Sequence, residues 1–211
     1  MLRIGLTGGI ACGKSAVAGI LREMGFRVLD ADALGHEVIE PGLPAYMEIV
    51  REFGVGVIGE SRRIDRGKLG AIVFADPAKL KSLNAIVHPR VEEGMVKKFA
   101  EWEREGVRDA IFVEAALLVE AGYQKRLDGL VVAWCKPEQQ IERLIARGLR
   151  EEEARRRIAA QMPAKEKLKF ATEKIDCSGT MEWTRGQVEE LAGRLRGGQP
   201  KRAGQAPPLQ E

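Results

Sequence analysis

The sequence predicts an α/β fold in which five parallel strands form a sheet flanked by helices, and two observations predict it. Short apolar runs of strand length recur along the chain, most of them followed by residues with helical spacing. A glycine-rich segment separates the first apolar run from the first helical pattern, which is the order found where such sheets bind phosphate. The expected strands cover residues 2–7, 26–30, 110–113, 130–133 and 174–176.

The glycine-rich segment runs from Gly8 to Ser15 and fits the pattern G-x-x-x-x-G-K-[ST] at every specified position. Glycines let consecutive backbone N–H groups curl around an anion, Lys14 supplies a positive charge toward the β- and γ-phosphates, and Ser15 offers a hydroxyl to Mg²⁺. The segment therefore predicts a nucleoside triphosphate site with Mg²⁺. The residues expected to hold the nucleotide are Gly8, Gly9, Ala11, Cys12, Gly13, Lys14, Ser15 and Ala16.

Length and composition narrow the class of protein. The 211 residues suit one α/β domain with inserted pieces, and the formal net charge of +3 gives no sign of a nucleic-acid or membrane partner. No apolar run approaches the length of a membrane span, and the first strand follows Met1 directly, so we expect a cytoplasmic protein. Three widely spaced cysteines predict no disulfide framework, and a monomer is the default expectation.

Two carboxylates follow the second strand. Asp30 ends the apolar run and Asp32 stands just before a helical pattern that begins near Ala33. Ligands of parallel sheets bind beyond the carboxyl ends of the strands, so we expect both side chains at the edge that carries the phosphate loop. Asp32 is also a suitable N-cap for the following helix, and the two roles are compatible.

The stretch from residue 43 to 105 is predicted to be mostly helical, with breaks at 54–63, at Asp76–Pro77 and at His88–Pro89. It is too long for a plain connection between strands, which favours an inserted helical module that binds substrate. A segment rich in arginine and glutamate follows between residues 147 and 161, and the tail 197–211 has the composition of a disordered segment.

A phosphate loop alone does not separate kinases from GTPases or nucleic-acid ATPases. The chain lacks an Asn-Lys-x-Asp sequence for reading guanine and lacks interleaved aromatic and basic residues for binding single strands. A small core with a helical insertion and an arginine-bearing segment that could close over phosphate favours a kinase of small metabolites.

Several short motifs together resemble the dephospho-coenzyme A kinase family. They are Leu6-Thr7-Gly8-Gly9-Ile10 before Gly13-Lys14-Ser15, Asp30-Ala31-Asp32 before His36-Glu37, Leu83-Asn84 with His88-Pro89, Leu117-Leu118 with Glu120, and Arg157-Ile158-Ala159-Ala160-Gln161. The resemblance covers nearly the whole chain before the tail. It implies transfer of the γ-phosphoryl group of ATP to the ribose 3′-hydroxyl of dephospho-coenzyme A, giving coenzyme A and ADP.

The resemblance also implies a three-layer P-loop nucleoside-kinase-like fold with a helical substrate-binding insertion and a helical lid. The expected single domain spans residues 1–196, with a core formed by 1–32, 108–137 and 164–196. The coenzyme A-binding insertion is expected at about 33–107, and the lid at about 138–163.

Matching positions imply roles for individual residues. Asp32 matches the catalytic aspartate, which orients the ribose hydroxyl and accepts its proton. Lys14 neutralises charge that builds near the transferred group, and Arg147 or Arg157 approaches it from the lid, although either arginine is also an ordinary exposed charge. The residues implied at the acceptor substrate are Thr7, Asp32, Arg66 and His88.

Alternative roles remain open for several of these residues. His88 also suits a helix end, because the following proline disfavours helical geometry, and Arg66 also suits a solvated helix face. Glu114 could reach Mg²⁺ through water, whereas Glu120 could brace local structure. The thiol of Cys12, beside Lys14 at a helix N-terminus, is predicted to favour the thiolate, to be easily alkylated and to be shielded by bound ATP.

The chain departs from the family pattern at several positions. Ala11 and Cys12 replace glycine and serine, and Ala16 replaces a threonine whose hydroxyl could contact the nucleotide. Glu114 and Ala116 replace the aspartate and proline of Asp-Ile-Pro-Leu-Leu. Two alternatives therefore stay open, namely another small-metabolite or nucleoside monophosphate kinase and a non-catalytic nucleotide-binding relative.

Overall fold

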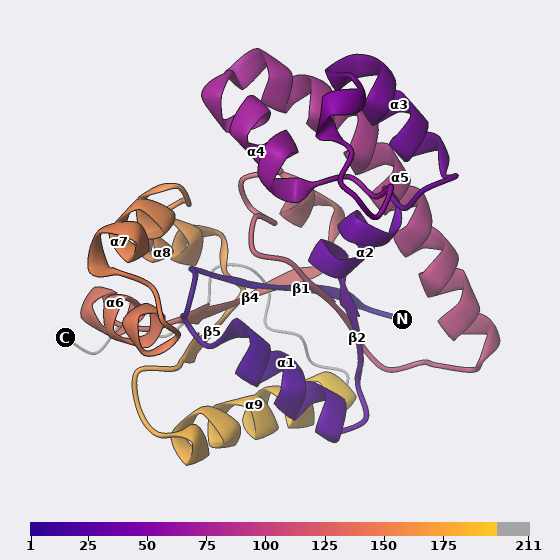
Figure 1. Ribbon diagram of the computed structural model, residues 1–211. Coiled ribbons are helices and arrows are strands. Elements are labelled where there is room, and N and C mark those ends of the chain that lie inside the picture. Colours follow the sequence, from indigo (N-terminus) through magenta and orange to yellow (C-terminus); the bar gives the residue numbers. More distant parts are fainter. Residues whose placement is uncertain (198–211) are drawn as a thin grey trace. The chain divides into compact units, whose positions relative to one another are not determined.

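The structure is a computed structural model that describes residues 1–197 (Figure 1). The chain divides into two compact units. The sheet unit contains Met1–Leu29 and the chain from Arg108 onward, and the helical unit contains Asp30–Val107. The tail predicted to be disordered lies outside the described residues from 198 onward.

Five parallel strands form one sheet in the order β2-β3-β1-β4-β5 (Figure 1). The central strand β1 pairs with β3 through Leu6 and Glu114 among others, and with β4 through Gly8 and Ala133. The predicted α/β class and strand number are thus confirmed. The strands are β1 (Arg3–Gly8), β2 (Arg27–Asp30), β3 (Ile111–Glu114), β4 (Gly129–Trp134) and β5 (Glu173–Asp176).

Near-continuous apolar runs form the inner strands because both faces of a parallel sheet are covered. On one face, α1 (Lys14–Glu23) and α9 (Met181–Arg196) pack side by side (Figure 1). Their buried residues join the strands in one core that includes Leu21, Phe112 and Leu191. Thr180 caps α9 by accepting a hydrogen bond from the backbone of Trp183.

Three further helices follow β4 in the sheet unit. They are α6 (Pro137–Ala146), α7 (Glu151–Ala159) and the short α8 (Ala164–Lys167), joined by tight turns. Leu144 and Ala154 from α6 and α7 pack against Ala11 of the phosphate loop. Two 3₁₀ turns, Tyr123–Arg126 and Leu168–Phe170, complete the unit.

The helical unit contains four helices and a 3₁₀ turn. Its core gathers residues such as Ile49, Leu69 and Val73 around the long last helix. The elements are α2 (Ala31–Glu37), α3 (Pro44–Phe53), a 3₁₀ turn (Val55–Val57), α4 (Arg66–Ala75) and α5 (Pro77–Arg104). The predicted breaks after Phe53 and at Asp76 are confirmed, and Asp76 caps α5 by accepting a hydrogen bond from Ala78.

The predicted break at His88–Pro89 is wrong, because α5 continues through Pro89 without interruption. A proline in a helix interior lacks the N–H that would bind the carbonyl four residues earlier, which costs about 3 kcal/mol. The helix α5 packs against α2, α3 and α4 along its length, and these contacts offset that cost. His88 therefore lies inside a helix rather than at its end.

The capping interpretation of Asp32 is also wrong. Asp30 is the N-cap of α2, and its carboxylate accepts a hydrogen bond from the backbone N–H of Ala33 at 2.9 Å. The helix consequently begins at Ala31, and Asp32 lies in its first turn. Both aspartates are suitable caps, and the extended backbone at Asp30 selects between them.

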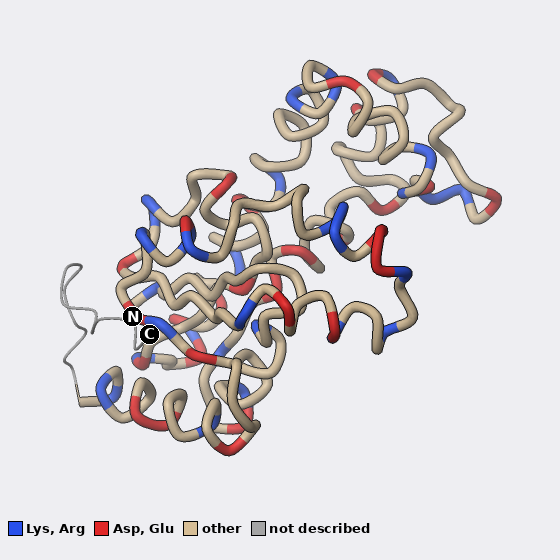
Figure 2. The backbone as a smooth tube through the Cα atoms, turned by 90° about the vertical axis from the view of Figure 1, so that its left-hand side faces the viewer, with Lys and Arg blue, Asp and Glu red and all other residues tan. Residues whose placement is uncertain are grey.

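Charges are distributed over the described chain with both signs interspersed (Figure 2). Some pairs lie one turn apart on a helix, such as Arg155 with Glu151 and Arg194 with Glu190. None of the helices within residues 1–197 combines the length and apolarity needed to cross a membrane.

Candidate active site

The phosphate loop connects β1 to α1, so the predicted order of strand, loop and helix is confirmed. Gly13 is the N-cap of α1 and has a φ of 93°, a left-handed conformation that favours glycine. A Cβ at this position would lie 2.8 Å from the side chain of Cys177. The carbonyl of Gly13 accepts hydrogen bonds from Ala16 and Val17, which starts the helix, and a helix N-terminus favours an anion.

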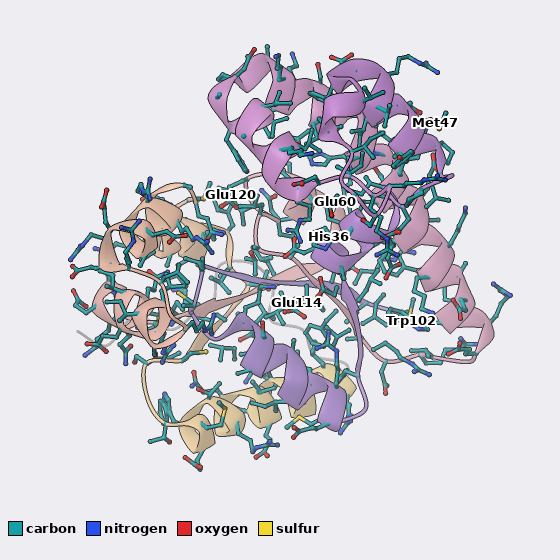
Figure 3. All side chains as sticks on the ribbon, in the orientation of Figure 1. His36, Met47, Glu60, Trp102, Glu114 and Glu120 are labelled. Atoms are coloured by element: carbon teal, nitrogen blue, oxygen red, sulfur yellow. The ribbon has the colours of Figure 1, made fainter. Side chains whose placement is uncertain are left out.

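Lys14 is held by a buried carboxylate. Its Nζ donates to Glu114 Oε1 at 3.0 Å, and Arg22 donates to the other oxygen, Oε2, at 3.2 Å. The Glu114 side chain is 5% exposed, and it lies beside α1 at the end of β3 (Figure 3). Two cations compensate the cost of burying this carboxylate. Glu114 therefore orients the ammonium group of Lys14, a role that sequence reasoning missed.

Ser15 lies in the first turn of α1 and is exposed, so its hydroxyl is accessible to a metal ion. Both oxygens of Glu114 already accept hydrogen bonds from cations. Within the described residues, no three acidic, histidine or cysteine side chains are grouped to hold a metal. The residues present fit Mg²⁺ held by Ser15 together with phosphate oxygens and water, the arrangement typical of this ion.

Thr7 is fully buried at the end of β1, and its hydroxyl donates to the carbonyl of Ala116 at 3.2 Å. The same carbonyl accepts a hydrogen bond from Lys167 Nζ at 2.6 Å. Lys167 also pairs with Glu120 at 2.9 Å, and Glu120 accepts the backbone N–H of Met162 at 3.0 Å (Figure 3). Glu120 thus braces local structure, and Thr7 and Lys167 fix the loop that follows β3.

We expect Lys167→Ala to lower the free energy of unfolding by about 2 to 4 kcal/mol, because it leaves a cavity and removes the partner of Glu120. The Lys167 side chain is 0% exposed, so its ammonium group depends on its protein partners. Chemical denaturation measures the change. Lys169→Ala is the matched control, since this exposed lysine forms only a surface ion pair with Glu166 and its loss should cost under about 1 kcal/mol. Equal effects of the two substitutions would contradict the prediction.

Cys12 in the phosphate loop and two cysteines beside the loop, Cys135 and Cys177, are free thiols, and all three are buried. The thiol of Cys135 donates to Cys12 Sγ at 3.5 Å, and this hydrogen bond is the main reason that the pKa of Cys12 is lowered to about 7. The same hydrogen bond and burial raise the pKa of Cys135, and burial raises that of Cys177 to about 11. The predicted direction for Cys12 is confirmed, but its main cause is Cys135 rather than Lys14 or the helix.

Burial argues against the prediction that Cys12 is easily alkylated, because this residue is 0% exposed. We expect native protein at pH 8 to react with iodoacetamide at Cys12 at least about tenfold more slowly than urea-unfolded protein. The thiolate is the major form at this pH, since it lies above a pKa of about 7, so slow labelling reports burial rather than protonation. Peptide mass spectrometry gives the rate, and equally fast labelling of the two states would refute the expectation.

The two lid candidates, Arg147 and Arg157, are both exposed. Arg147 ends α6 as its C-cap, and Arg157 on α7 pairs with Glu153 at 2.6 Å. A third arginine, Arg143 on α6, contacts the loop directly by donating to the carbonyl of Ala11 at 3.2 Å and to that of Cys177 at 2.7 Å. Sequence reasoning did not single it out from the other arginines of this segment.

In the helical unit, the candidate residues lie on three helices. Asp32 is in the first turn of α2, which follows β2 directly. Arg66 is the first residue of α4, which Asp65 caps by accepting hydrogen bonds from Gly67 and Lys68. His88 is exposed on α5. Each of these residues is therefore held on a regular helix.

A parallel sheet whose central strand leads through a phosphate loop into a helix defines the class of P-loop nucleotide-binding proteins. Lys14 and Ser15 stand at the positions that contact phosphate and metal in this class. The class includes kinases, in which the protein contributes positioning and positive charge rather than covalent chemistry.

The family within this class follows from comparison with known proteins. A model of the dephospho-CoA kinase family matches residues 2–182. A dephospho-CoA kinase from Symbiobacterium thermophilum is 48% identical over 88% of this chain and 78% of its own. One from Carboxydothermus hydrogenoformans is 45% identical over 88% and 90%. The chain belongs to the dephospho-CoA kinase family and is an ATP-dependent kinase.

Solved structures agree with this family. Dephospho-CoA kinase from Campylobacter jejuni has a TM-score of 0.68 and 26% identity, covering 93% of this chain and 98% of its own. The protein TT1252 from Thermus thermophilus has a TM-score of 0.80 and 36% identity, covering 92% and 97%. The likeness extends over nearly the whole chain and includes both units.

Proposed function

We propose that this chain transfers the γ-phosphoryl group of ATP to the ribose 3′-hydroxyl of dephospho-coenzyme A, giving coenzyme A and ADP. Membership of the dephospho-CoA kinase family, matched across residues 2–182, carries the proposal. The intact phosphate loop with Lys14 held by Glu114 supports it from the chemistry of the site. The roles of individual residues in transfer are part of this proposal.

The nucleotide binds with its phosphates over the loop and the N-terminus of α1. Backbone N–H groups of the loop donate to phosphate oxygens, and Lys14 stabilises the charge that develops between the β- and γ-phosphates. Ser15 would hold Mg²⁺, which, when bound, neutralises charge on the phosphate oxygens. The loop residues in this role are Gly8, Gly9, Ala11, Cys12, Gly13 and Ala16.

Asp32 prepares the acceptor. A ribose hydroxyl is a weak nucleophile, and a carboxylate within hydrogen-bonding distance orients it and accepts its proton as transfer proceeds. The carboxyl ends of parallel strands share one edge of a sheet, and α2 starts directly after β2, which supports a place for Asp32 near the transferred phosphate. The N-cap of α2 is Asp30, so capping is not the task of Asp32.

Further roles are proposed for residues of the lid and of the helical unit. Arg147 or Arg157 approaches the transferred phosphoryl group when residues 138–163 close over the nucleotide. Residues 33–107 form the coenzyme A-binding module, in which Arg66 meets phosphate and His88 contacts the acceptor or supports its pocket. Thr7 supports the acceptor site through the loop that it fixes after β3.

One assay tests the proposed function. Purified protein is incubated with Mg-ATP and dephospho-coenzyme A, or with AMP, CMP or shikimate in its place, and ADP formation is followed. We expect rapid ADP formation with dephospho-coenzyme A alone and a product phosphorylated at the ribose 3′-position. Preference for another acceptor would indicate a different small-metabolite kinase. If no ADP forms with any of the four acceptors, the protein is a non-catalytic nucleotide-binding relative.

We further propose that the protein acts in the cytoplasm as a monomer and without nucleic acid. Its two substrates are small and anionic, and the weak net charge of +3 suits them without requiring a polyanion. Size-exclusion chromatography with light scattering tests the monomer, which has a mass of 23.2 kDa.

A further inference from the structure

The crest of the phosphate loop, at Ile10, is bound by two glutamines that the proposed function does not use. Gln161 Oε1 accepts the backbone N–H of Ile10 at 2.8 Å. Gln140 Nε2 donates to the backbone carbonyl of Ile10 at 2.7 Å. Both main-chain polar groups of one loop residue are therefore satisfied by side chains that lie 130 and 151 residues away in the sequence.

The two glutamines come from the two ends of one helical segment. Gln140 lies near the start of α6 and is 6% exposed, and Gln161 follows the end of α7. Leaving the N–H or the carbonyl of Ile10 without a partner in this partly buried site would cost about 1 kcal/mol, so each hydrogen bond is favoured once the segment is folded. The segment between β4 and α8 is thus attached to the loop at both of its ends.

Packing around the crest is equally close. A Cβ on Gly9 would lie 2.7 Å from Gln140 Nε2, so the approach of this side chain requires glycine. Ala11 has a φ of 60°, in the left-handed region, and its side chain is buried against Leu144 and Ala154. Arg143 adds a hydrogen bond to the Ala11 carbonyl. The crest is consequently fixed on the α6–α7 side by hydrogen bonds and by apolar contact.

The N–H and the carbonyl of Ile10 belong to two consecutive peptide groups. Neither peptide plane can rotate without breaking a hydrogen bond to Gln161 or Gln140. The peptides that follow, toward Gly13 and Lys14, carry the N–H groups that face phosphate in a loop of this type. Donors already aimed at their target need no reorganisation during transfer, which is how such groups lower a barrier.

We propose that Gln140 and Gln161 are positioning residues for phosphoryl transfer, which clamp the Ile10 peptides and set the orientation of the loop's phosphate-binding N–H groups. This inference rests on the proposed function. In this proposal the start of α6, at Gln140, and the residue after α7, Gln161, stay bound to the phosphate loop. Only the remainder, with Arg147 and Arg157, is then left to move over the nucleotide.

The chemistry of the two contacts gives an asymmetric test. Gln161 acts as an acceptor, so Gln161→Glu keeps the oxygen that Ile10 N–H needs, whereas Gln161→Ala removes it. We expect Gln161→Ala to lower kcat by about twofold to tenfold, the range for one net hydrogen bond, and to speed hydrogen exchange at the Ile10 amide. Gln161→Glu should restore most of kcat and the exchange protection, although its charge could raise KM for ATP.

Thr172→Val is the matched control. Thr172 binds the N–H and the carbonyl of one strand residue, Leu130, at 2.8 and 3.1 Å, as the two glutamines together do at Ile10. Like Gln140, it also lies against a glycine, Gly129. This site is at the amino-terminal end of β4, whereas the phosphate loop follows the carboxyl end of β1. We expect Thr172→Val to lower the melting temperature as much as Gln161→Ala while leaving kcat within about twofold.

Three outcomes would overturn the proposal. The first is that Gln161→Ala leaves hydrogen exchange at the Ile10 amide unchanged. The second is that Gln161→Glu restores neither kcat nor exchange protection relative to Gln161→Ala, and the third is that Thr172→Val loses as much kcat as Gln161→Ala. If Gln161→Ala does not fold, Gln161→Met, which keeps the side-chain length, takes its place. Absence of wild-type turnover would count against the proposed function alone, because Ile10 exchange is measured without substrates.

Discussion

Asp32→Asn is expected to lower kcat by about 10² to 10⁴, because an amide cannot accept the proton of the ribose hydroxyl. The affinity for ATP should change little, since the proposed contacts of ATP are made by the phosphate loop. Turnover of dephospho-coenzyme A at saturating substrate measures the first quantity, and equilibrium binding of ATP measures the second. A kcat close to that of the wild type would remove Asp32 from the role of general base.

The structure supplies a matched control for this substitution. Asp30 caps α2, and asparagine caps helices about as well as aspartate, so Asp30→Asn should keep the fold and leave kcat within about threefold. Asp32→Asn removes a negative charge from the first turn of α2, which costs under about 1 kcal/mol at an exposed site. Unfolding therefore cannot account for a loss of several orders of magnitude in Asp32→Asn. Equal losses in both variants would point to disruption of α2 instead.

Local patterns predicted the sheet and the phosphate loop because the physics that forms them is local. Each buried strand needs a short apolar run, and the loop needs glycines followed by Lys14 and Ser15 at fixed spacing. The break at His88–Pro89 failed because local preference was outweighed by packing of α5 against three other helices. Similarly, two aspartates with equal capping propensity could not be ranked without the backbone angles at Asp30.

Contacts between distant parts of the chain escaped sequence reasoning. The glutamate that holds Lys14 is 100 residues further along, and the two glutamines at Ile10 are 130 and 151 residues away. Glutamine is common on helix surfaces, so nothing in the sequence marks Gln140 as unusual, and Gln161 stands out only as the last residue of the motif Arg157-Ile158-Ala159-Ala160-Gln161. A partial signal existed at Glu114, because a charged residue directly after a fully apolar strand needs a partner once it is buried.

Lys14→Met is expected to lower kcat by about 10² to 10³ and to weaken ATP binding, because the methionine side chain has a similar length but no charge for the β- and γ-phosphates. The fold should survive, since Glu114 keeps its contact with Arg22 at 3.2 Å. We expect a loss of roughly 1 to 3 kcal/mol in the free energy of unfolding from the weaker compensation of the buried carboxylate. Steady-state kinetics and chemical denaturation measure the two effects separately.

Arg22→Met separates the catalytic charge of Lys14 from its structural pairing with Glu114. Arg22 donates to the opposite oxygen of the same carboxylate, so its loss should also destabilise the fold, by less than Lys14→Met because the Arg22 side chain is 45% exposed and that of Lys14 is 15% exposed. The ammonium group of Lys14 remains in place, and kcat should therefore stay within several-fold of the wild-type value. If Arg22→Met reduced kcat as severely as Lys14→Met, the buried Glu114 pair, rather than the charge presented to phosphate, would govern the activity of this site.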